Sequence, residues 1–213
     1  MSSTEDEQLA DIKDWWNRNG KPLLTGGLLA LAVVVGWNGW HKHQSNQAQE
    51  ASSLYQQLLE TTFDPSGKPD VAKVAELSNK LKADYAGTHY AQYASLFAAK
   101  IAVDAGKLDD AAAELQGVVA KPVDATLGEL ARQRLARILA AQNKAEEGLK
   151  LLDGDAEKAF VASREELKGD LLVKVGRADD ARSAYEKAKA ALSDEAAVGS
   201  LQMKLDDLAK GDA

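Results

Sequence analysis

The sequence contains no cysteine and only three histidines among its 213 residues. The absence of cysteine excludes disulfide bonds, thiol catalysis, zinc fingers and lipoprotein acylation. The three histidines, His41, His43 and His89, are too few for an obvious Ser/His/Asp triad or a histidine-rich metal site. We therefore expect a fold held by packing alone, with no enzymatic activity, no metal and no cofactor.

Dense basic segments are also missing. The net charge is -7 and the sequence pI is about 5.1, whereas nucleic-acid binding depends on neutralising phosphates. We therefore expect no nucleic-acid partner. The alternation typical of strands is absent too, so no glycine-rich phosphate loop follows a strand.

One long uncharged run is present. Residues 23–40 read LLTGGLLALAVVVGWNGW, and a helix of this length spans about 27 Å, close to the hydrocarbon thickness of a bilayer. A core helix of a soluble domain would show a polar face, which this run lacks. A cleaved signal peptide would need a short basic start and a small-residue cleavage site, whereas Trp37 and Trp40 close this run. The run predicts an uncleaved membrane anchor, with Trp15 and Trp16 forming the other aromatic belt.

Basic residues near the anchor predict its orientation. Lys13, Arg18 and Lys21 precede the run, while Lys42 is the single basic residue within 20 residues after it. The more basic flank stays in the cytoplasm, so in a bacterium the C-terminal part lies in the periplasm. The expected division is a cytoplasmic tail at 1–22, an anchor at 23–40, a linker at 41–46 and a periplasmic domain at 47–213.

Small residues in the anchor have the spacing that permits close contact between membrane helices. They are Gly26, Ala30, Ala32 and Gly36. Two interpretations apply, a transmembrane partner or the ordinary composition of membrane helices. His41 and His43 allow two interpretations as well. They could hold a metal, but no third ligand is near, which favours polar residues at the membrane surface.

A six-residue pattern recurs in the C-terminal part. It reads GKLDDA from Gly106, NKAEEG from Asn143 and GRADDA from Gly176, with offsets of 37 and 33 residues. Such a period is typical of a solenoid. Gly or Asn can end a helix in the left-handed conformation, and the two acids suit the start of the next helix. The pattern predicts helix–turn–helix repeats. Helices at 47–62 and 70–84, around a turn-rich loop at 64–69, predict an atypical first repeat.

These repeats resemble tetratricopeptide repeats. In the last copy Gly169, Ala181, Tyr185 and Ala188 match that repeat's small, small, aromatic and small positions, although its signature tryptophan is absent. The expected fold is all-α: a single N-terminal transmembrane helix, then a divergent tetratricopeptide-like α-solenoid with a C-terminal capping helix at about 194–210. In this frame the concave, partner-binding face comprises Tyr93, Leu96, Lys100, Gln133, Arg137, Asp170 and Lys174. For Tyr93, simple packing is an equal alternative.

Three segments extend the resemblance to the whole chain: WWNRNGK before the membrane run, Y-x2-L after it, and AGKLDDAAAEL around the first hexad. With them the chain resembles the ancillary subunits of the bacterial Sec translocon, a family of membrane-anchored periplasmic tetratricopeptide-like proteins. The resemblance implies a non-enzymatic, chaperone-like role for newly translocated envelope proteins. The implied partners are the translocon channel subunits, a membrane-anchored periplasmic prolyl isomerase and unfolded envelope proteins.

A protein of a different class would share the same architecture. An anchored repeat scaffold for cell-wall synthesis or division machinery also combines one membrane helix with a repeat domain. A chaperone should protect unfolded clients from aggregation and co-purify with the translocon. A scaffold should do neither, and should localise to the septum or to sites of wall synthesis.

Overall fold

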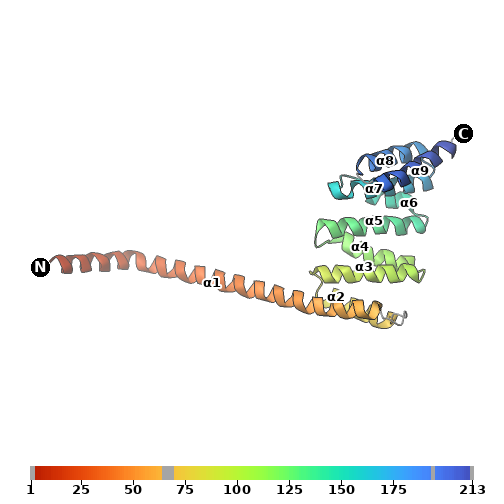
Figure 1. Cartoon of the computed structure of the whole chain (residues 1–213). Helices are drawn as coiled ribbons and strands as arrows, with labels where there is room; N and C mark the ends of the chain where they lie inside the picture. Colours follow the sequence, from red (N-terminus) through yellow and green to blue (C-terminus); the bar gives the residue numbers. More distant parts are fainter. Residues whose placement is uncertain (1–2, 64–69, 193–194, 212–213) are drawn as a thin grey trace. The chain divides into compact units, whose positions relative to one another are not determined.

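The computed structural model describes residues 3–63, 70–192 and 195–211, and the chain divides into two compact units, Met1–Glu50 and Ala51–Ala213. The expected turn-rich loop at 64–69 lies outside the described residues. Most of the described residues are helical and none of them forms a strand, as the all-α prediction requires. Figure 1 labels the helices in chain order.

The first helix, α1 (Ser3–Thr62), is long and continuous. Every residue from Lys21 to Trp40 is exposed, including Leu28 at 65% and Val33 at 69%. An exposed apolar run of this size finds no protein core to bury it, and a bilayer provides the missing apolar environment. Among the described helices, α1 is the one long and apolar enough to cross a membrane, which confirms the predicted apolar helix.

Residues 41–46, predicted as a linker, are helical and belong to α1. Neither glycine nor proline occurs between Trp40 and Thr62, and exposed polar side chains are compatible with a helix. The positions where α1 enters and leaves a membrane stay a prediction.

The second unit is built from pairs of antiparallel helices. The last part of α1 shares a buried core cluster with α2 and α3, and further helices follow in chain order (Figure 1). Their bounds are α2 (Val71–Asp84), α3 (His89–Asp104), α4 (Leu108–Ala120), α5 (Ala125–Ala141), α6 (Ala145–Leu151), η1 (Lys158–Phe160), α7 (Val161–Lys174), α8 (Ala178–Ala190) and α9 (Glu195–Gly211). Each helix packs against the next, so the core is a series of adjoining clusters, as in a solenoid.

The recurring hexad forms the same turn three times. Gly106, Asn143 and Gly176 have φ values of 73°, 62° and 77°, which is the left-handed region. The following residue donates its N–H to a carbonyl five residues earlier, with distances of 2.8 Å for Lys107 to Ala102, 2.8 Å for Lys144 to Leu139 and 2.9 Å for Arg177 to Leu172. This is the Schellman arrangement, and it confirms the helix-ending role predicted for the hexad.

Small residues allow the paired helices to approach each other. Ala111 and Ala181 are fully buried, and a Cβ on Gly148 would lie 2.9 Å from the carbonyl oxygen of Ala136. Gly169 faces the ring of Tyr185, with no room for a methyl group between them. The signature positions predicted from the tetratricopeptide resemblance therefore lie at helix–helix contacts.

Two elements complete the unit. Helix α6 is short and ends before Gly154, which has a φ of 84° and turns the chain toward η1 and α7. Helix α9 buries Leu201 and Leu205 against α8 and leaves Gln202 and Asp206 exposed. A polar outer face of this kind is what a terminal helix of a solenoid needs, so the capping prediction is confirmed.

Candidate protein-interaction surface

The first helices of successive repeats, α3, α5 and α7, carry the residues predicted to face a partner. We call the row of exposed and half-buried residues on these helices the first-helix face; it comprises Tyr93 and Lys100 on α3, Leu130, Arg134 and Arg137 on α5, and Glu166 and Asp170 on α7. Lys100 is exposed and pairs with Asp104 at 2.5 Å. Lys174 is exposed near the end of α7 and donates to the carbonyl of Ala140. Partner binding by these residues stays a prediction.

Two of the predicted contact residues lie inside the domain. Leu96 is 7% exposed and belongs to the core cluster formed by α3, α4 and α5. Gln133 is 4% exposed, and its amide donates to Glu129 at 2.9 Å and to Ser163 at 3.1 Å. Neither side chain is open to a partner, because residues of α4 and α5 cover Leu96 and the Gln133 amide is engaged with Glu129 and with Ser163 of α7. Arg134, which the sequence frame missed, lies on the first-helix face together with Arg137.

Aromatic rings gather at the start of the first-helix face. We call Tyr55, Tyr90 and Tyr93 the tyrosine cluster, because their ring centroids lie 5.6 Å (Tyr55–Tyr90), 5.7 Å (Tyr55–Tyr93) and 6.3 Å (Tyr90–Tyr93) apart. All three side chains are half-buried. Burial, together with the two neighbouring tyrosines, raises the pKa of Tyr55. Tyr93 therefore packs against the rings of Tyr55 and Tyr90 and is still partly exposed to solvent.

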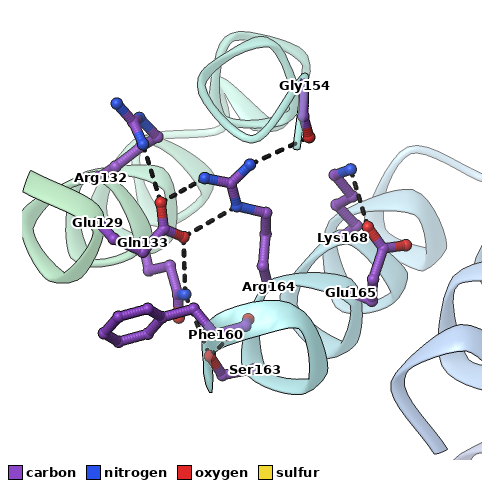
Figure 2. Close-up of polar contacts among 9 residues, drawn as sticks. All are labelled: Glu129, Arg132, Gln133, Gly154, Phe160, Ser163, Arg164, Glu165 and Lys168. Carbon is purple, nitrogen blue, oxygen red and sulfur yellow. Dashed lines mark hydrogen bonds and ion pairs between the residues drawn. The ribbon is translucent and has the colours of Figure 1, made fainter. Parts of the chain in front are cut away.

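Glu129 is the centre of a buried polar network between α5 and α7, drawn in Figure 2. Its carboxylate accepts hydrogen bonds from Arg164 through both Nε, at 2.9 Å, and Nη2. Arg132 donates to it at 2.8 Å and Gln133 at 2.9 Å. The remaining end of the Arg164 guanidinium donates to the carbonyl of Gly154 at 3.1 Å. Glu129 and Arg164 are 5% and 3% exposed, so each charge depends on the other.

This network determines the ionisation of Glu129. Burial raises the pKa of the carboxyl group, but hydrogen bonds from Arg164, Gln133 and Arg132 and the positive charge of Arg164 outweigh burial and lower the pKa to about 2. A bidentate guanidinium contact of this type strongly favours the carboxylate form. The role of the network is structural, since it joins two consecutive repeats across the short α6.

A lowered carboxyl pKa makes stability depend on pH. Glu129 binds its proton less readily in the folded than in the unfolded chain, so its contribution is present above pH 4.5 and is lost as the pH falls toward about 2. We expect wild type to lose about 3 kcal/mol more unfolding free energy than Glu129→Gln over this window. Urea titrations of the full chain in mild detergent, followed by circular dichroism, measure the difference. If the unfolding free energies of wild type and Glu129→Gln changed equally with pH, the prediction would be contradicted.

Asp170, another predicted contact residue, already has partners. It accepts a hydrogen bond from the Tyr185 hydroxyl at 2.8 Å and one from Lys204 of α9 at 2.6 Å. Lys204 also forms an ion pair with Glu166 at 2.8 Å, so this one lysine is paired with both acids on the first-helix face of α7. Burial lowers the pKa of Lys204, but its bonds to Asp170 and Glu166 outweigh burial and raise it. The acidic row of α7 is therefore partly neutralised from within the domain.

The small residues of the anchor lie on the exposed surface of α1. A Cβ added at Gly26 or Gly36 would meet no atom within 4 Å, and Ala30 and Ala32 are also exposed. Contact with another membrane helix stays a prediction. The ring of His41 lies 4.7 Å from Trp37 and 5.5 Å from Trp40. Within the described ranges no group of three metal-ligating side chains is assembled.

Known proteins with similar sequences match this chain over nearly its whole length. Residues 13–210 match the family described as Tetratricopeptide repeat-like domain. The chain is 34% identical over 204 residues to the Ancillary SecYEG translocon subunit of Escherichia coli (strain K12), covering 96% of each chain. It is 31% identical over 206 residues to the protein of that name from Neisseria gonorrhoeae, covering 96% of this chain and 97% of the relative. No solved structure matches the chain significantly.

Proposed function

The chain belongs to the family of ancillary SecYEG translocon subunits, whose members it matches over nearly its whole length, and we propose that it assists newly translocated envelope proteins at the Sec translocon. In this role it is a non-enzymatic, chaperone-like accessory subunit. The observation that carries the proposal is the 34% identity over 96% of the chain, which spans the anchor and every repeat.

The arrangement in the membrane is part of the proposal. The apolar run of α1 crosses the inner membrane once, with residues 1–22 in the cytoplasm, 23–40 in the bilayer, and the repeat domain in the periplasm after the connecting segment 41–46. The excess of basic residues before the run supports this orientation. The small residues Gly26, Ala30, Ala32 and Gly36 are then available for contact with translocon helices.

The repeat domain provides the interaction surface in this proposal. Solenoids bind partners along extended faces built from equivalent positions of successive repeats. The first-helix face supplies half-buried tyrosines and exposed charged residues, a combination found where proteins bind other chains. Unfolded envelope proteins and a membrane-anchored periplasmic prolyl isomerase are the partners that we assign to the domain, and channel subunits are assigned to the anchor.

Crosslinking in native membranes tests the proposal. A photo-reactive residue at Tyr93 should capture translocating envelope proteins, the isomerase or channel subunits, whereas the same group at exposed Met203 on α9 should capture far fewer. The full chain in nanodiscs should also slow aggregation of an unfolded envelope protein. Capture of wall-synthesis or division proteins, with localisation at the septum and no protection of clients, would overturn the proposal in favour of a scaffold.

A further inference from the structure

Two arginines on the first-helix face have no partner. Arg134 and Arg137 are exposed, and within the described part of the chain neither forms an ion pair or a hydrogen bond. The arginines elsewhere in the repeat domain are all engaged. Since residues three apart on a helix are neighbours, the two guanidinium groups lie on one face of α5. They form a site of positive charge without an internal counter-ion.

An apolar surface on the same face belongs to the tyrosine cluster. Tyr93 on α3 and Leu130 on α5 occupy equivalent positions 37 residues apart, and both pack against the same core cluster. Arg134 follows Leu130 by one helical turn. The starts of α3 and α5 lie side by side, because His89 Nε2 is 3.0 Å from the carboxylate of Asp124, the residue that caps α5. The apolar part of the face on α3 therefore lies beside the start of the helix that carries the two arginines.

The tyrosine hydroxyls add hydrogen-bonding capacity. Those of Tyr55, Tyr90 and Tyr93 form no hydrogen bond to any residue that the structure describes. Half-buried tyrosines with free hydroxyls present apolar ring faces to a side chain and donors to backbone carbonyls. The backbone carbonyls of an extended chain are free to accept such bonds, whereas those within a helix are already paired.

We propose that this face binds extended segments in which an aromatic or aliphatic residue is followed or preceded by an Asp or Glu. The apolar residue lies on the tyrosine cluster, and the carboxylate pairs with Arg134 and Arg137. This inference rests on the proposed function and names the chemistry of its client. It explains why the α7 acids are neutralised by Lys204 while the α5 arginines are left open.

The dimensions of the face fix the spacing in the segment. One turn of α5 separates Leu130 from Arg134, which is about 6 Å, and neighbouring helices pack about 10 Å apart, so tyrosines and arginines lie about 12 Å apart. An extended chain covers this distance in about three or four residues. In a helical segment the same residues would be separated by only about 5–6 Å along the axis, which is too short.

Peptide binding by the full chain in zwitterionic nanodiscs tests the inference. The probes are labelled Gly/Ser-based peptides with one Phe and, about four residues later, Glu, Gln or Lys. We expect wild type to prefer the Glu peptide. In Arg134→Glu/Arg137→Glu, affinity for the Glu peptide should fall about tenfold while affinity for the Lys peptide rises, because the charges are exchanged. Tyr93→Ala should weaken all three peptides.

A matched control separates a site from general electrostatics. Lys144→Glu/Lys150→Glu changes the net charge equally at exposed residues at the turn before α6 and within that helix, and should leave the preference for Glu intact. An equal loss in this control, equal binding of the Glu and Gln peptides by wild type, or no binding of any peptide overturns the inference. If the peptides fail but Tyr93 still captures clients in membranes, the proposed function stands without this specificity. Charge-dependent peptide binding without capture of clients in membranes and without protection from aggregation would support the specificity and contradict the proposed function.

Discussion

Replacing Gly169 by alanine is expected to lower the free energy of unfolding by about 3 kcal/mol, although alanine is the better helix former. A Cβ at this position would lie 2.8 Å from Cζ of Tyr185, and closer still to Cδ1 and Cε1 of the same ring. The ring cannot move away, because Tyr185 is 3% exposed and its hydroxyl donates to Asp170 at 2.8 Å. Helices α7 and α8 must therefore separate to admit one methyl group.

Gly117→Ala on α4 is the control for this prediction. Gly117 is also inside a helix, but a Cβ there would meet no atom within 4 Å. The control should be stabilised by about 0.5–1 kcal/mol through helix propensity alone. Urea titrations of the full chain in mild detergent compare the two variants. Equal stability of Gly169→Ala and Gly117→Ala would show that the α7–α8 contact adapts at little cost.

The repeat architecture could be predicted because its signals are local. A left-handed residue, a basic residue and two acids recur in sequence, and each affects the ends of its own two helices. The length and uncharged composition of residues 23–40 are likewise properties of one segment. Residues 41–46, expected to connect the anchor to the domain, are helical, because polar composition alone does not end a helix and neither glycine nor proline occurs between Trp40 and Thr62.

The surface was harder to predict than the fold. The frame placed exposed Arg137 correctly but took buried Gln133 rather than exposed Arg134 as the other contact residue of α5, and both positions lie within one helical turn of Arg137. Leu96 was placed on the surface although α4 and α5 cover it. The Glu129–Arg164 pair was not predicted at all, because its partners lie 35 residues apart and charged residues are rarely buried. The available signal was in α7, where the charged Arg164 lies one helical turn from the apolar Val161 and Leu167.

Replacing Arg164 by methionine is expected to cost about 3–5 kcal/mol of unfolding free energy near neutral pH. The substitution keeps a long apolar side chain but leaves the carboxylate of Glu129 buried, with only Arg132 and Gln133 to compensate. It also removes the donor to the carbonyl of Gly154, which holds the loop after α6. Circular dichroism of the full chain during urea titration measures the loss.

The pH dependence of stability and a double variant identify the cause of the loss in Arg164→Met. Without Arg164 the pKa of Glu129 should rise from about 2. As the pH falls, the variant's unpaired carboxylate is therefore neutralised at a higher pH than the carboxylate of wild type. The unfolding free energies of the two proteins should then converge in acid. Glu129→Leu/Arg164→Met replaces both charges by apolar groups and should recover most of the loss, since it leaves no unpaired buried charge. If the double variant is as unstable as Arg164→Met at every pH, the buried carboxylate is not the cause. The lost contact to Gly154 would then account for the effect, and the stability of this step of the solenoid would be assigned to the loop after α6.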